Sequence, residues 1–176
     1  YFKKGDSFNI KNWQVPALID TEKFEVIQSD SSSVTFSKSA ALTNYSGKVF
    51  HLDIKRKIQV LDKKATEQIL LTTIPVGVDY VAYRSINQLI NSGNNQWEKE
   101  SGLLSIWLLS MMTPTEETKV IIPFSPQPNS RSFITDNYFG EIPHYRLLVK
   151  DSLLYFRCDG KSRGKIGIAP AIAKPV

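Results

Sequence analysis

Residues 50–60 alternate between apolar and polar side chains, and this pattern restricts the fold more than any other part of the sequence. The apolar positions are Phe50, Leu52, Ile54, Ile58 and Val60. Polar or charged side chains occupy the odd-numbered positions between them, and only Arg56 interrupts the apolar series. Successive side chains of a strand point to opposite faces. The pattern therefore predicts an antiparallel strand with one buried face and one solvated face.

Further segments have strand-like composition, and they lie at 24–28, 34–37, 68–73, 78–90, 103–111, 120–124 and 165–168. A hairpin is predicted where 146–149 and 153–158 flank a polar turn at 150–152. Clusters of Ser, Asn, Asp, Gly and Pro separate the segments, and no long stretch has a helical period. We therefore predict an all-β protein, an antiparallel β-sandwich in which residues 1–176 form a single domain.

The segment 103–111 is the most apolar part of the chain, and its short length fits either a strand or a helix. Gly102 before it and Pro114 after it favour a strand, as do the β-branched and aromatic side chains within it. Trp107 belongs to this run, so we predict a core position for it. Trp13 and Trp97 follow irregular or turn segments, where a stacking role and a structural role are about equally expected.

Composition excludes several classes of protein. No run of about 18 apolar residues is present, so the chain is predicted not to span a membrane. The single cysteine, Cys158, excludes an intrachain disulfide. The net charge of +5 comes partly from short basic clusters at 55–57, 63–64 and 161–165. We interpret them as a solvated strand face and a basic turn, and predict no nucleic-acid partner, because no nucleic-acid-binding motif accompanies them.

Residues 85–97 read Ser-Ile-Asn-Gln-Leu-Ile-Asn-Ser-Gly-Asn-Asn-Gln-Trp. This stretch resembles the strand, Asn-Thr-Gly-Asp and aromatic pattern of galactose-mutarotase-like supersandwich proteins. Other segments resemble an uncharacterised family of secreted bacterial proteins with that fold, and they lie at 8–16, 42–47, 100–107, 136–140 and 159–167. Members of that family are longer than this chain.

The resemblance implies that the chain is a section of a supersandwich, with strands missing before Tyr1 and after Val176. It also implies a periplasmic or extracellular location in the bacterial envelope, with a possible lipid anchor outside this chain. Proteins with this fold bind sugars on a concave face. Fold similarity alone does not define an activity, so the sugar has to be argued from particular side chains.

Mutarotases use two histidines and a carboxylate as acid and base groups. This chain has two histidines, His51 and His144, but neither lies in a segment that matches the mutarotase catalytic pair. Those roles are therefore not transferred, and no catalytic residue is assigned. His51 alternates with charged residues on the polar side of its strand, which is typical of a surface residue.

The best candidate for a ligand-binding segment is the polar loop 136–146. Its candidate residues are Asp136, Tyr138, Glu141, His144 and Arg146, and Trp97 is a further candidate from outside the loop. Carboxylates accept hydrogen bonds from sugar hydroxyls, a tyrosine ring can stack on a pyranose, and an arginine can bind a uronic-acid carboxylate in bidentate fashion. The alternative is an ordered loop held by its own polar groups.

These observations lead to three alternative functions. The first is a carbohydrate-binding or carbohydrate-processing protein of the bacterial envelope, with no assigned reaction. The second is a non-catalytic structural or interaction domain of a surface lipoprotein, which the lack of a catalytic motif favours. The third is an aldose-1-epimerase-like mutarotase. We expect no cofactor, and no metal, because the acidic and histidine residues have no ligand spacing.

Overall fold

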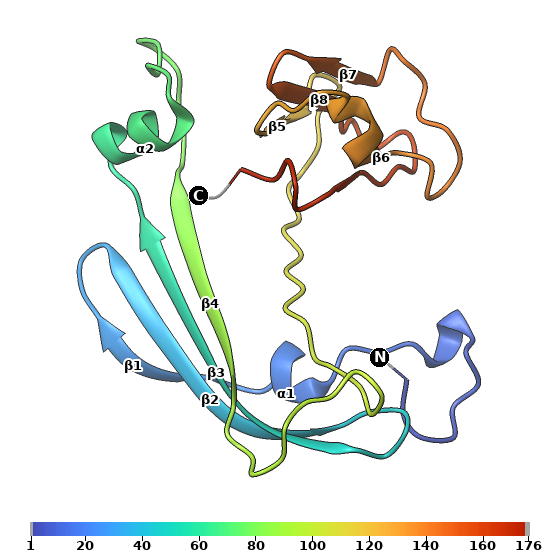
Figure 1. The fold of residues 1–176 in the computed structure, drawn as a ribbon. Helices are drawn as coiled ribbons and strands as arrows, with labels where there is room; N and C mark the ends of the chain where they lie inside the picture. The colour runs from blue at the N-terminus through green and yellow to red at the C-terminus, as the bar shows by residue number, and fades with distance from the viewer. Residues whose placement is uncertain (1, 175–176) are drawn as a thin grey trace. The chain divides into compact units, whose positions relative to one another are not determined.

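The computed structural model describes residues 2–174, and its regular structure consists mainly of antiparallel strands (Figure 1). Strands make up 33% of the chain and helices 11%, so the predicted all-β class is confirmed. The chain divides into two compact units, one that ends at Leu108 and one that begins at Leu109. The sandwich arrangement and the single domain stay predictions.

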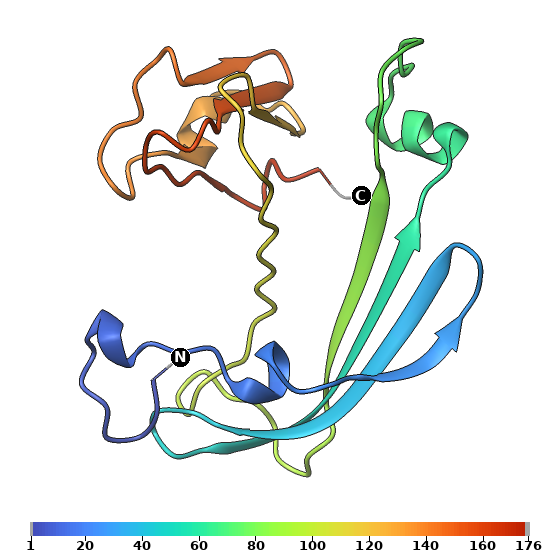
Figure 2. The same cartoon turned by 180° about the vertical axis from the view of Figure 1, so that it is seen from behind.

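The first unit contains a four-stranded antiparallel sheet with the order β1-β2-β3-β4 (Figures 1 and 2). Its strands are β1 (Glu25–Ser29), β2 (Ser33–Thr43), β3 (Val49–Val60) and β4 (Tyr83–Asn91). The alternating segment of the sequence is β3, which pairs with both β2 and β4. Phe50 and Leu52 are buried on one of its faces, whereas His51 on the other face is exposed. The strand prediction for 50–60 is confirmed.

A single aspartate organises the turn between β1 and β2. Asp30 Oδ1 accepts hydrogen bonds from the backbone N–H groups of Ser32 at 2.8 Å and Ser33 at 2.7 Å, and Oδ2 accepts one from Ser33 Oγ at 2.7 Å. Asp side chains form such turns because they can replace a backbone acceptor. The hydroxyl of Ser33 and the two N–H groups lower the pKa of Asp30 to about 2.

The prediction of a strand at 68–73 is wrong, because α2 (Lys63–Leu70) covers the first half of this segment. Asp62 caps this helix, with Oδ1 accepting a hydrogen bond from the Ala65 N–H at 2.8 Å. Leu71 ends it in the left-handed conformation. Two further short helical turns precede β1: η1 (Ile10–Asn12) and α1 (Ala17–Asp20).

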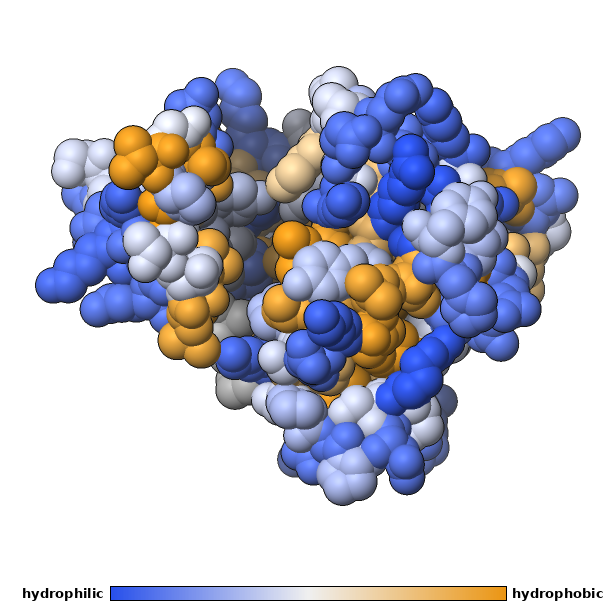
Figure 3. Space-filling view, turned by 90° about the horizontal axis from the view of Figure 1, so that it is seen from above, coloured by the Kyte–Doolittle hydropathy of each residue, from blue (hydrophilic) through white to orange (hydrophobic). Residues whose placement is uncertain are grey.

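The strand predicted at 103–111 is also wrong, since these residues form no strand in the structure. Trp107, predicted as a core residue, has 67% of its surface exposed and makes an edge contact with Trp13 at 6.2 Å between ring centroids. A strand needs a neighbour for its N–H and C=O groups, and composition does not supply one. Apolar side chains are visible at the surface among hydrophilic ones in the view from above (Figure 3).

The second unit contains a three-stranded antiparallel sheet with the order β5-β8-β7. Its strands are β5 (Lys119–Pro123), β7 (Leu147–Lys150) and β8 (Leu153–Arg157). The short strands β6 (Ile134–Thr135) and β9 (Gly167–Ile168) form a second pair, which the helical turn η2 (Ser130–Phe133) precedes. β7 and β8 confirm the predicted hairpin, and Asp151 turns between them with a φ of 54°.

The two faces of this small sheet differ in character. One face packs into a core whose buried members are Phe124, Ile134, Ile142, Leu147, Leu154 and Ile172. The opposite, outer face carries side chains at alternating positions of the three strands, namely Lys119, Ile121, Leu148, Tyr155 and Arg157. Because side chains alternate along a strand, burying one face fixes which residues the sheet displays on the other.

Candidate ligand-binding site

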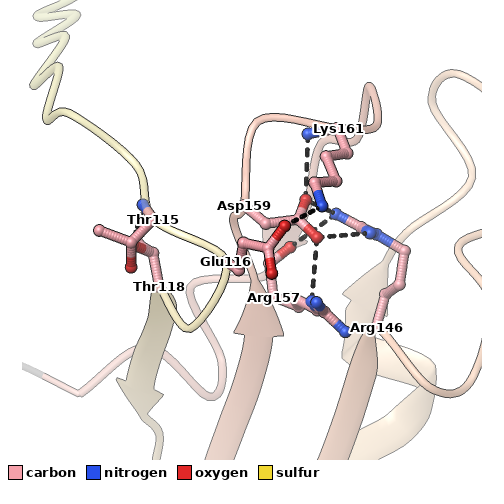
Figure 4. Close-up of polar contacts among 7 residues, drawn as sticks. All are labelled: Thr115, Glu116, Thr118, Arg146, Arg157, Asp159 and Lys161. Atoms are coloured by element: carbon pink, nitrogen blue, oxygen red, sulfur yellow. Dashed lines mark hydrogen bonds and ion pairs between the residues drawn. The ribbon is translucent and has the colours of Figure 1, made fainter.

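A buried ion pair lies at the open end of the β7–β8 hairpin, beside the outer face of the sheet. Arg146 directly precedes β7, and Asp159 follows β8 by two residues. Arg146 Nη1 donates to Asp159 Oδ2 at 3.2 Å and Nη2 to Oδ1 at 2.7 Å (Figure 4). The Arg146 side chain is 7% exposed and that of Asp159 is 2% exposed. Bidentate pairing of this kind fixes both side chains in one geometry.

The carboxylate oxygens of Asp159 have further partners besides Arg146. The backbone N–H of Lys161 donates to Oδ1 at 3.0 Å, and Arg157 Nε lies 2.9 Å from Oδ2 as an ion pair. Arg146 Nη2 in addition donates to the Arg157 carbonyl at 3.1 Å. The hydrogen bonds from Arg146 and then from Lys161 hold the pKa of Asp159 well below its usual range. The same carboxylate raises the pKa of Arg146.

Cys158 lies between Arg157 and Asp159 and is only partly exposed. Burial raises the pKa of its thiol, with the charge of Asp159 acting in the same direction and that of Arg146 in the opposite one. A thiolate is the reactive form of cysteine, so this environment disfavours a nucleophilic role. The thiol is better described as a small packing side chain.

A cavity of about 360 Å³ opens on the outer face of the sheet, next to this ion pair. Its lining residues are Glu116, Glu117, Lys119, Tyr145, Arg146, Leu148, Tyr155 and Arg157. Glu116 forms an ion pair with Lys161 Nζ (Figure 4). The volume is within the range of small-molecule sites, at its lower end. The cavity therefore combines two tyrosines with charged groups of both signs.

The structure places the predicted ligand residues in several environments. Arg146 lines the cavity, but its guanidinium is engaged with Asp159. Asp136 is paired with Arg131 at 2.6 Å. Glu141 and His144 are exposed, and neither lines the cavity.

The two aromatic candidates have ring partners already. Lys165 Nζ lies over the Tyr138 ring, 4.6 Å from its centroid. Trp97 belongs to the first unit, where it makes an edge contact with Phe50 at 5.8 Å between centroids. His51, on β3, also belongs to the first unit. The structure therefore gathers Arg146 with residues that were not singled out in the sequence.

Of the residues that line the cavity, the sequence singled out only Arg146, and the missed ones include Lys119, Tyr145, Tyr155 and Arg157. The alternation within 119–123 and 153–157 contains the necessary signal for three of them, because it separates core-facing from outward-facing positions. Tyr145 lies inside the loop already considered for binding. Predicting the cavity would also have required the pairing of β5 with β8.

These features define an antiparallel β protein with a charged, tyrosine-lined cavity on the outer face of a small sheet. The chain belongs to a family of unknown function (DUF6786), whose profile matches residues 1–176. No curated protein and no solved structure matches the sequence of this chain.

Residues 2–174 contain neither a membrane-crossing helix nor a cluster of metal ligands. No helix in this part of the chain combines the length and apolar character needed to cross a membrane. His, Cys, Asp and Glu side chains there form no group of three that would hold a metal ion. The outer-face cavity brings together charged and tyrosine side chains that suit a polar ligand, whereas a cavity of about 600 Å³ in the first unit is lined mostly by apolar residues between Leu61 and Tyr83.

The ion pair predicts an acid-dependent loss of stability. Because the pKa of Asp159 is lower in the folded chain than the value of about 4 in an unfolded one, its carboxylate stabilises the fold above about pH 4. That contribution is lost as the pH falls further. We expect the stability difference between the natural chain and Asp159→Asn to shrink from about pH 5 to about pH 2. Urea unfolding followed by amide NMR signals of β8 measures it, and a constant difference would contradict it.

Proposed function

We propose that this protein binds carbohydrate at the outer-face cavity of the second unit, as a component of the bacterial envelope and without an assigned reaction. The observation that carries the proposal is the lining of the cavity. Tyr145 and Tyr155 share it with two carboxylates, Glu116 and Glu117, and with the cations Lys119 and Arg157. Aromatic rings and charged hydrogen-bonding groups thus lie within reach of one small ligand.

Sugars present hydroxyl groups that both donate and accept hydrogen bonds, and C–H faces that pack on aromatic rings. Carboxylates accept hydrogen bonds, whereas lysine and arginine donate them, so the cavity offers both kinds of partner to a ring of hydroxyls. A tyrosine supplies a flat apolar surface and a polar end. Tyr145 has 74% of its surface exposed, which leaves its ring available to a ligand.

The cavity is a better candidate than the remainder of the loop 136–146. Lys165 lies over the ring of Tyr138, and the guanidinium of Arg163 lies over Phe139 at 4.0 Å from the centroid. Each of these rings therefore has one face occupied by a cation, which is a stabilising contact within the loop. The loop contributes to the proposed site through Tyr145 and Arg146 at its end.

Saturation-transfer NMR with a panel of neutral and acidic mono- and disaccharides tests the proposal on the whole chain. We expect Tyr145→Ala to raise the Kd of a bound sugar by about 3- to 10-fold, the loss expected for one aromatic contact. Tyr138→Ala is the matched control and should leave the Kd unchanged.

Binding of no sugar by the natural chain would contradict the proposal and favour a non-catalytic interaction domain. Loss of binding in Tyr138→Ala with normal binding in Tyr145→Ala would place the site at the part of the loop around Tyr138 instead of at the cavity. Polarimetry on fresh α-glucose or α-galactose tests the mutarotase alternative, in which the protein would accelerate the change of optical rotation.

A further inference from the structure

Two cations stand directly opposite each other in the wall of the cavity. Lys119 on β5 and Arg157 on β8 are register partners in the antiparallel pair, so their side chains leave the sheet on the same face. Both line the cavity. Like charges in directly opposed positions of a sheet destabilise it. A negative charge between or beside the two side chains would reduce this repulsion.

Most of the nearby carboxylates are already committed to other cations. Asp159 is paired with Arg146, and Glu116 is paired with Lys161. Within residues 2–174 Lys119 forms no ion pair, and Glu117 is the one cavity carboxylate without a cationic partner there. When the paired groups cancel, Lys119 and Arg157 carry two positive charges against one negative charge on Glu117. The cavity therefore has one positive charge in excess, which matches a ligand with a single negative charge.

The ion pair with Asp159 restricts the side chain of Arg157 beside the cavity. Its Nε faces Asp159 Oδ2 at 2.9 Å, and this nitrogen has no aligned hydrogen bond of its own among the described residues. The side chain is 38% exposed, so part of the guanidinium remains open to the cavity. A planar guanidinium binds a carboxylate through parallel N–H···O bonds. Less side-chain freedom is lost on binding when one edge is already anchored.

We propose that the ligand is an acidic sugar, a hexuronate or a glycan ending in one, whose carboxylate is bound between Lys119 and Arg157. This inference rests on the proposed function, since it assumes that a sugar occupies the cavity. The sugar ring then lies toward Tyr145 and Tyr155, and its hydroxyls face Glu117. The sequence suggested a uronate at Arg146, whereas the structure assigns that task to Arg157 because Arg146 is engaged with Asp159.

The test is an NMR titration of the whole chain with D-galacturonate and D-glucuronate, each compared with its uncharged methyl ester. We expect at least one acid to bind about 10-fold or more tightly than its ester, as charge-assisted hydrogen bonds predict. Acetate serves as the carboxylate without a sugar ring and should bind much more weakly.

Three variants test whether Lys119 and Arg157 bind the carboxylate. Lys119→Gln removes one exposed cation without touching Asp159, and Arg157→Lys keeps the charge but removes the planar fork. Both are expected to reduce the preference for acid over ester to about 3-fold or less. Lys150→Gln is the matched control, since Lys150 is an exposed lysine at the other end of β7 and does not line the cavity. The preference should be unchanged in it.

The outcomes separate this inference from the proposed function. Equal binding of acids and esters would overturn the inference and leave carbohydrate binding standing. Acetate binding as tightly as the uronates would overturn both and leave only an anion site. An acid preference that survives in Lys119→Gln and in a folded Arg157→Lys would overturn the placement of the carboxylate.

Discussion

We expect Arg146→Met to lower the midpoint of thermal unfolding of the second unit by about 10 °C or more, because a buried charge then loses its main partner. Asp159 is 2% exposed and would keep its position with only Arg157 and one N–H group to compensate it. The Arg157 carbonyl would lose a donor as well. Met retains much of the apolar volume of the arginine stem, so the loss reports mainly on charge and hydrogen bonding.

The measurement must follow the second unit itself. All three tryptophans, Trp13, Trp97 and Trp107, belong to the first unit, so tryptophan fluorescence would report on the wrong part of the chain. Amide NMR signals of 153–157, followed with temperature, report on β8 directly.

Two controls define what the result means. Arg131→Met breaks the Arg131–Asp136 pair, in which the arginine side chain is 58% exposed, and should shift the midpoint little. Combining Arg146→Met with Asp159→Leu should recover part of the loss, since removing both partners of a buried pair costs less than removing one. A single variant as stable as Arg131→Met would show that the pair is not buried in solution.

The parts of the fold that were predictable are those in which local pattern and burial agree. In β3 the alternation of Phe50 and Leu52 with polar neighbours reports directly which face is covered. In β7 and β8 the polar turn between two apolar segments predicts the hairpin, and the chain reverses there within two residues, Asp151 and Ser152. Such features depend on residues close together in the sequence.

The wrong predictions concern segments whose structure depends on what lies beside them. Residues 103–111 have the composition of a strand, but a strand forms only where a neighbour pairs with its backbone. The apolar residues of 68–73 are compatible with a strand as well as with a helix. The cap at Asp62, which begins α2, was the local signal that should have decided for a helix.

The candidate site was only partly predictable for a related reason. Arg146 was recognised as a group suited to carboxylates, but its carboxylate is Asp159 of the same chain, 13 residues away. Lys119 and Arg157 are 38 positions apart in the sequence and become neighbours only through the pairing of β5 with β8. Sequence pattern supplies the outward-facing positions, whereas strand order decides which of them share a cavity.

The second large effect is expected from Leu154→Ala on β8. Leu154 is fully buried and lies opposite Ile122 and Val149 on the core side of the sheet. Truncation to alanine leaves a cavity and should cost about 2–5 kcal/mol of unfolding free energy. Ile121→Ala is the matched control, because Ile121 is 55% exposed on the outer face, and we expect it to cost less than about 1 kcal/mol. Hydrogen exchange at the backbone amides of 153–157 measures both losses.

The same variant separates the scaffold from the proposed site. Tyr155 directly follows Leu154 on β8 and Arg157 lies three residues beyond it; both face outward, and neither depends on Leu154 for a hydrogen bond. At temperatures where Leu154→Ala remains folded, its Kd for a bound sugar should therefore stay within about 2-fold of the natural value, since buried and outward positions alternate along the strand. A Kd that rose in step with the loss of stability would mean that the core side of β8, and not the ion pair at its end, holds the cavity residues in place.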